Sequence, residues 1–391
     1  MKWHQSNTKE NGGVSLPNQW VFLHYYEAYN ALFRVENALR LLVYIVLKEK
    51  HGDKWLTVNT TSDDNAETTI GKIAKQRMNQ TQRFGYLGYV VPCPLMYLTS
   101  GELSKLITSD AYWRLFTPYI QGSKEIISNK LDELNSVRNA LAHFRPIKAD
   151  DLDVIKHNAR HILTKVESSL VDIMRCSNVV PTNTNEHWYS ELRSLGTELC
   201  TLSFNQSNDE KWIKLSFNYP CPVIKSEGGN SHRRLRVLSL NTPAILNHYP
   251  TLQARTIIMF EEADYGYVVR TGGEVKFSKT VHLITSRATL EEYYAMLKTD
   301  IEGMLLQILE ETNLIMNDNL ARGKLIQAVD VMADQRETYW IYKISQLKQA
   351  VSATTSPEYW GQYISPDDDF ITSTERYPWM PVDISEGDIP F

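Results

Sequence analysis

Apolar residues recur at spacings of three and four through the first 175 residues, and shorter runs of β-favouring residues follow. The first pattern predicts helices at 20–51, around 66–78, at 100–107, at 111–119, from Ser123 to just after His143, and from Asp150 or Asp151 to about 173. Gly52 and Pro146 stand where two of these helices should end. The N-terminal part should therefore be an all-α bundle.

The later pattern predicts strands at 212–218, 234–240, 255–260, 265–271, 274–277 and 281–285. A brief helix is expected at 188–196, and helical periodicity returns at 289–315 and at about 324–353. The chain is thus expected to be a multidomain α+β protein. Its predicted parts are a helical domain at 1–180, a sheet-containing domain with C-terminal helices at 186–355, and a tail at 356–391.

The tail differs from the rest of the chain in charge. Residues 351–391 hold eight acids and one base, which gives −7, so the net charge of −5 leaves about +2 for residues 1–350. The tail cannot form a core of its own, but its isolated aromatic residues can dock elsewhere. An acidic tail of this kind also suits a restraint that lies in a basic cleft, and a nucleic-acid partner stays compatible with the sequence.

The apolar segments and the cysteines give a first expectation of the cellular location of the protein. The longest apolar run, Leu41–Leu47, is far shorter than the roughly 20 residues that cross a bilayer, and the first twenty residues lack an apolar signal segment. The four cysteines are scattered, with no CxxC pair. We therefore expect a cytoplasmic protein with reduced thiols, no membrane association, no metal and no cofactor.

Two polar features interrupt the apolar helices. Polar residues on the first helix step by three or four and form one stripe: Glu27, Asn30, Arg34, Asn37 and Arg40, with Glu36 one turn before Arg40. The second feature is the segment Arg138-Asn139-Ala140-Leu141-Ala142-His143, at the end of a later helix. This segment places an Arg and a His five residues apart at a helix end.

This segment resembles the signature of the HEPN family, in which an Arg is followed by four residues and a His, often with a polar residue directly after the Arg. The stretches LNSVRNALAHF at 134–144 and YLTSGELSKLI at 97–107 also look like HEPN domains found with bacterial restriction and anti-phage systems. The resemblance covers roughly residues 20–170. It implies a helical HEPN domain, a metal-independent endoribonuclease activity and a homodimer that forms one composite cleft.

The residue types suit that chemistry. Attack by the RNA's own 2′-hydroxyl needs proton transfer, which His143 can provide, and a cation for the phosphorane charge, which Arg138 can provide. Asn139 and His143 share a helix face, whereas Arg138 lies about 140° away from His143. A second chain would remove that awkwardness. Glu36 and Arg40 are expected to orient Arg138 or His143, although a plain ion pair between them is an equal alternative.

Two further groups are candidates for other roles. Arg233, Arg234 and Arg236 follow a Gly-Gly pair on a predicted loop and strand, where they would contact RNA phosphates or form a solvated loop. His157 and His161 are four apart on a helix, but the Glu of HExxH is missing between them, so a solvent-facing pair is expected.

The leading hypothesis is an endoribonuclease that leaves 2′,3′-cyclic phosphate ends, acting as a toxin or anti-phage effector on single-stranded RNA or a tRNA loop. An antitoxin or a defence-system protein is the expected partner. Two alternatives stay open: a non-catalytic HEPN protein that binds RNA or nucleotides, and an interaction scaffold of a defence complex. Cleavage of RNA in EDTA separates the first hypothesis from both alternatives.

Overall fold

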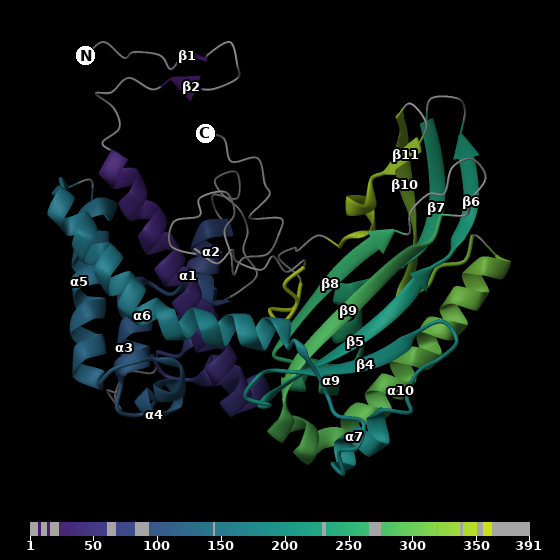
Figure 1. The fold of residues 1–391 in the computed structure, drawn as a ribbon, viewed down its shortest axis with the longest axis horizontal. Helices are drawn as coiled ribbons and strands as arrows, with labels where there is room; N and C mark the ends of the chain where they lie inside the picture. The colour runs from purple at the N-terminus through teal and green to yellow at the C-terminus, as the bar shows by residue number, and fades with distance from the viewer. Residues whose placement is uncertain are drawn as a thin grey trace.

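The protein, seen in a computed structural model, is described over residues 7–8, 14–15, 23–60, 68–82, 94–143, 145–228, 232–265, 275–318, 320–336, 339–349 and 355–361. A helical part and a part built on antiparallel sheets lie side by side (Figure 1). This mixed architecture confirms the expected α+β composition. Most of the predicted tail, residues 362–391, lies outside the described residues.

The helical part is built around one long central helix. Its helices are α1 (Leu23–His51), α2 (Ile70–Gln82), α3 (Ser100–Thr108), α4 (Trp113–Phe116), α5 (Lys124–Ala142) and α6 (Ala149–Arg175). α1 packs against α3, α5 and α6, and its apolar residues between Ala28 and Leu47 are nearly all buried, which is why its sequence is apolar almost all round. Gly52 follows α1 at a φ of +57°, a left-handed conformation that favours glycine.

Two larger antiparallel sheets form the second part. The five-stranded sheet has the order β3-β4-β5-β9-β8, and the four-stranded sheet has the order β11-β10-β7-β6. The strands are β3 (Asn178–Val179), β4 (Thr201–Gln206), β5 (Trp212–Cys221), β6 (Val223–Gly228), β7 (His232–Leu240), β8 (Ile258–Tyr265), β9 (Phe277–Ser286), β10 (Ile326–Arg336) and β11 (Tyr339–Tyr342). A small β1 (Asn7–Thr8) and β2 (Val14–Ser15) pair with each other.

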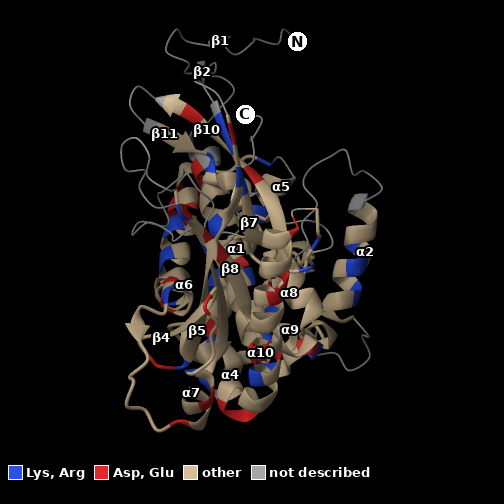
Figure 2. Ribbon diagram, turned by 90° about the vertical axis from the view of Figure 1, so that its right-hand side faces the viewer, with Lys and Arg blue, Asp and Glu red and all other residues tan. Residues whose placement is uncertain are grey.

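Helices cover both faces of the five-stranded sheet. Trp212 of β5 belongs to the core of the helical part, whereas Ile213 and Leu215 belong to a second core that includes the buried side of α10 (Arg287–Asn317). Alternate side chains of one strand thus enter two different cores. Short helices α7 (His187–Leu192), α8 (Thr242–His248) and α9 (Pro250–Arg255) complete this part (Figure 2).

A buried junction joins the helical part, the sheet and the start of the tail. The Tyr44 hydroxyl of α1 donates to the Ile257 carbonyl at 2.6 Å, and the Lys48 ammonium pairs with the Glu358 carboxylate at 2.7 Å. Both members of that ion pair are at most 4% exposed. Backbone hydrogen bonds from Met259 to the Glu358 carbonyl and from Trp360 to the Met259 carbonyl attach residues 358–361 beside β8. The first aromatic residues of the predicted tail therefore dock on the folded chain.

The prediction of a helix at 324–353 is wrong. Residues 326–336 and 339–342 form β10 and β11, and β10 lies between β7 and β11 in the four-stranded sheet. Gln, Ala and Met in this segment favour a helix when isolated, but pairing with β7 along nine residues overrides that preference. Sequence reasoning also missed the strands β4 and β6. The strand expected at 265–271 falls mainly outside the described residues.

The other helices agree with the pattern to within a few residues. α6 begins earlier than expected: its N-cap is Lys148, and the Asp151 carboxylate accepts the Lys148 backbone N–H at 2.7 Å. Asp151 therefore stabilises the first turn from inside the helix and does not cap it. Among the described helices, none combines the length and the apolar character needed to cross a membrane.

Candidate active site

The Arg138–His143 segment occupies the last turn of α5. The helix begins at Ser123, whose hydroxyl accepts the Ile126 N–H at 3.4 Å, and ends with His143 as its C-cap residue. The terminal carbonyls have partners: the Arg145 N–H donates to Ala140 at 2.8 Å, and the Tyr29 hydroxyl of α1 donates to Leu141 at 2.9 Å. Because these groups would otherwise lack partners, the contacts fix this turn against α1.

Arg138 faces the polar stripe of α1. Its Nε lies 4.0 Å from one carboxylate oxygen of Glu36, and the other oxygen accepts a hydrogen bond from Arg40. Arg138 is 36% exposed, whereas the side chains of Glu36 and Arg40 are 14% and 12% exposed. One carboxylate is therefore placed between two guanidinium groups, of which only Arg138 is substantially open to solvent.

Arg40 is held firmly in its place. Its guanidinium donates to the Asn37 side chain and to the Leu98 carbonyl, each at 3.0 Å. Leu98 directly precedes the N-cap of α3, where the Thr99 hydroxyl accepts the Glu102 N–H and the Glu102 carboxylate accepts the Thr99 N–H. This capping box fixes the carbonyl that Arg40 binds, so three helices determine where Glu36 points.

Asn139 and His143 lie apart from that ion-pair group. Both residues are exposed, and within the described residues the His143 side chain makes no hydrogen bond or ion pair. Glu36 and Arg40 thus meet Arg138 and not His143. This arrangement agrees with helix geometry, because Asn139 and His143 lie on one face of α5 and Arg138 lies on another.

The positive charge near the motif comes from residues that directly follow it in the chain. Acidic and basic residues are intermixed over the helical part and the sheets in Figure 2. Arg145 and Lys148 are exposed and follow the motif within five residues, so the end of α5 is locally basic. Next to it on α1, Tyr29 and Phe33 are 49% and 37% exposed and lie one turn apart. Exposed aromatic side chains beside cations suit a base-stacking or subunit contact.

The three arginines expected to bind RNA are divided by their strand. β6 and β7 form the antiparallel hairpin that contains them. Arg234 forms an ion pair with Asp330 of β10, and Arg236 is the cross-strand neighbour of Asp330. Arg233 points to the opposite face, where its Nε donates to the Ser226 hydroxyl at 3.3 Å. The three side chains therefore do not lie together on one face of β7.

Other sequence candidates have ordinary surroundings. His157 is exposed and His161 is half-buried on α6. Over the described ranges, no group of three His, Cys, Asp or Glu side chains is placed to hold a metal ion. Cys176, Cys200 and Cys221 are free and buried, and burial raises the pKa of each thiol to about 12. Cys93 lies outside the described residues.

The structure also shows two polar groups in the sheet that the sequence did not indicate. The Ser216 hydroxyl lies 2.8 Å from Nδ1 of His282, and Nε2 of His282 lies 3.4 Å from the Glu262 carboxylate. Ser216 is 7% exposed and the His282 ring stacks on Phe260, so this row connects three neighbouring strands without presenting a nucleophile to solvent.

The second group is the fully buried ion pair between Glu261 and Lys279, at 2.9 Å. The Lys279 ammonium also donates to the carbonyls of Leu240 and Leu347, each at 2.9 Å, and the Glu261 carboxylate accepts the Gln349 N–H at 2.6 Å. Every charge in this pair is therefore compensated, which is the condition for burying it.

Comparisons of the chain with protein-family models, with curated proteins and with solved structures gave no significant match.

Proposed function

We propose that the protein is a metal-independent endoribonuclease whose site is the end of α5. The observation that carries this proposal is the placement of Arg138. Its guanidinium faces the Glu36 carboxylate, with Nε 4.0 Å from the carboxylate oxygen, and stays partly open to solvent at the same helix end that exposes His143. A cation and an exposed imidazole at one helix end supply the positive charge and the proton transfer that phosphodiester cleavage by an internal hydroxyl requires.

In the proposed reaction the 2′-oxygen of the RNA attacks the adjacent phosphorus, and the bond to the 5′-oxygen of the next nucleotide breaks. A base accepts the proton of the 2′-hydroxyl, and an acid supplies a proton to the departing 5′-oxygen. His143 performs these transfers, because imidazole exchanges protons near neutral pH. Arg138 binds the phosphorane oxygens. The products carry a 2′,3′-cyclic phosphate and a free 5′-hydroxyl.

The homodimer is part of the same proposal. A second copy of the α5 end would supply a second His143, so one imidazole can act as base and the other as acid. Tyr29 and Phe33, exposed beside the motif, support a contact between subunits at this place. A molar mass of a monomer by light scattering at micromolar concentration would contradict the composite site. A role as a toxin or anti-phage effector follows only from the resemblance of the helical domain.

The test is cleavage of total RNA in EDTA, with the ends mapped for 2′,3′-cyclic phosphate. We expect His143→Ala and Arg138→Ala to lower the cleavage rate at least about 100-fold. His157→Ala is the matched control, because His157 is an exposed histidine on the neighbouring α6. Cleavage that requires Mg²⁺, or that His143→Ala leaves intact, contradicts the mechanism.

A further inference from the structure

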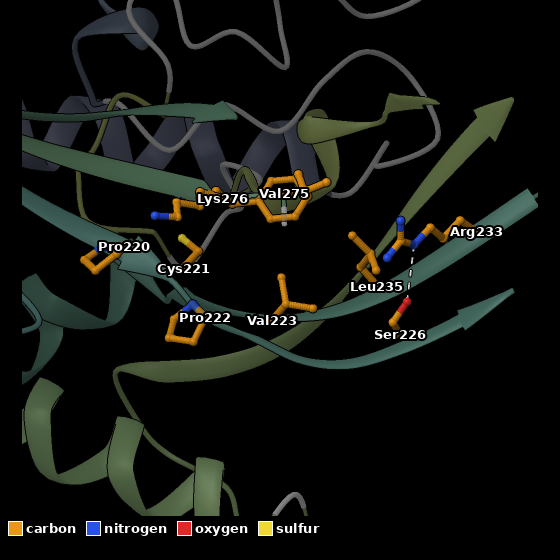
Figure 3. A pocket seen from close by; sticks show the side chains of 10 residues that line it. Pro220, Cys221, Pro222, Val223, Ser226, Arg233, Leu235, Val275 and Lys276 are labelled. Atoms are coloured by element: carbon orange, nitrogen blue, oxygen red, sulfur yellow. Dashed lines mark hydrogen bonds between the residues drawn. The ribbon is translucent and has the colours of Figure 1, made fainter. Parts of the chain in front are cut away.

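A cavity of about 410 Å³ lies in the sheet part. Its walls come from the end of β5, the β6–β7 hairpin and the start of β9, close to where β5 passes through Pro222 into β6. Figure 3 shows the side chains that line it. The volume falls within the usual range for small-molecule sites, about 300–1,000 Å³. Neither Arg138 nor His143 lines it, so it is separate from the proposed nuclease site.

The two ends of this cavity carry positive charge. Arg233 lies at one end beside the Ser226 hydroxyl, and Lys276 lies at the other (Figure 3). Among the described residues that line the cavity there is no carboxylate, and within the same described part of the chain neither Arg233 nor Lys276 forms an ion pair. The contrast with Arg234, one residue along the same strand, is informative, because Arg234 is neutralised by Asp330. A guanidinium next to a hydroxyl is suited to a phosphate group.

The middle of the cavity is apolar. Leu235 and Phe277 are buried in its wall, and Val223 remains 38% exposed there. Apolar surface left open between two cations favours a ligand that is itself divided, with an anionic head and a flat apolar body. Burial raises the pKa of the Cys221 thiol to about 12, so the sulfur in this wall is neutral and does not repel an anion.

We propose that this cavity binds a nucleoside monophosphate. Arg233 and Ser226 hold the phosphate, the base packs on Val223 in the wall that the buried Leu235 and Phe277 complete, and Lys276 contacts polar atoms at the far end of the ligand. The site belongs to the sheet part and does not depend on the proposed ribonuclease activity.

The test is isothermal titration of the full-length protein with each of the four ribonucleoside 5′-monophosphates, their nucleosides and inorganic phosphate. At least one monophosphate should bind with a Kd below about 1 mM. Its nucleoside and phosphate alone should each bind about tenfold more weakly or worse. If no monophosphate binds, or if a nucleoside binds as tightly as its monophosphate, the proposal is overturned.

Variants assign the binding to this cavity. Arg233→Gln should weaken binding of the monophosphate about tenfold or more, and Lys276→Gln, an exposed position that does not endanger folding, should weaken it several-fold. Arg234→Gln is the matched control on the other face of β7 and should leave the Kd unchanged. Equal effects of Arg233→Gln and Arg234→Gln would overturn the assignment. Single-stranded RNA binding far more tightly than any monophosphate, with the same dependence on Arg233, would overturn the choice of a small ligand.

Discussion

Glu36 has an unusual position, because one carboxylate serves two guanidinium groups. One oxygen is used by Arg40, and the other faces Arg138 at 4.0 Å. Arg40 is fixed by Asn37 and Leu98, so Glu36 cannot follow Arg138 if that side chain moves. Glu36 is therefore a positioning residue: it limits the orientations of Arg138 while leaving its charge available to a phosphate.

Glu36→Gln is expected to lower RNA cleavage about 10- to 100-fold, because the amide cannot hold Arg138 by charge. Glu36→Asp keeps the charge and should retain more activity than Glu36→Gln. Initial rates in EDTA, at a temperature where circular dichroism shows the variants folded, provide the measurement. Glu27→Gln is the control, since Glu27 lies on the same helix but pairs with Lys156 on the surface. Equal rates for all four proteins would show that Glu36 has no role in the site.

Contacts between individual residues were predicted correctly from the sequence only where helix periodicity applies. The stripe on α1 brought Glu36 and Arg40 together because they are four residues apart. Contacts between strands could not be predicted in this way. Glu261 and Lys279 are paired and fully buried, yet their local sequences look like ordinary polar surface positions. Only the pairing of β8 with β9, which has no signal in either strand alone, puts them inside.

Among the elements, α3 shows how a short helix is fixed at its start. Burial alone would raise the pKa of the Glu102 carboxylate, but hydrogen bonds from Arg77 and Thr99 outweigh it and hold the pKa below the ordinary value of 4.5. Arg77 contacts both carboxylate oxygens, at 2.7 and 2.8 Å, from α2. One carboxylate thus completes the capping box of α3 and ties α3 to α2, next to the carbonyl that anchors Arg40.

The stability of the protein should therefore depend on the ionisation of Glu102. Because its pKa is lower in the folded state, its contribution is complete above the unfolded value of about 4.5 and is lost as the pH falls through the folded value. Glu102→Gln should cost about 1 kcal/mol at pH 7, and the difference from wild type should shrink as the pH falls below 4.5. Urea unfolding at several pH values measures this. Asp132→Asn, at an exposed position of α5, is the control. A constant difference between wild type and Glu102→Gln from pH 7 to pH 3 would contradict the ionisation argument.

Elements were predicted well where caps and periodicity act within one segment. α5 begins at Ser123 and ends at His143 as its N-cap and following proline indicate. β10 was mistaken for a helix because its partner, β7, lies almost 90 residues earlier in the chain. A short segment of Gln, Ala, Val and Met carries no local preference strong enough to show that partner.

At the scale of the whole molecule, the buried junction at Lys48 joins the helical part to the sheet part. The expected division into a helical domain and a sheet domain rests on the change of period, but the core of the helical part includes Trp212, Ile258 and Phe260 from the sheet. The ion pair between Lys48 and Glu358 adds a contact across 310 residues of chain. Gln253 and Ser356 also contact Glu358, so the carboxylate is well compensated.

Removing one member of this pair should be strongly destabilising, because the other charge would remain buried alone. We expect Lys48→Met or Glu358→Met to lower the free energy of unfolding by about 3–5 kcal/mol. The double variant should lose less than either single one. The control is Asp110→Asn, which removes an exposed pair with Lys124 and should cost less than about 1 kcal/mol. Thermal and urea unfolding report the result, and additive losses in the double variant would show that the two groups do not interact.

The attachment of residues 358–361 has a consequence for self-association. β8 is the last strand of the five-stranded sheet, and its outer edge would otherwise offer free backbone N–H and C=O groups to any passing strand. The chain covers part of that edge with its own segment, through bonds to Met259 and Glu261. Lys48 of α1 pairs with Glu358 in this covering segment. The buried ion pair that stabilises the fold therefore also protects the protein from aggregation through the edge of β8.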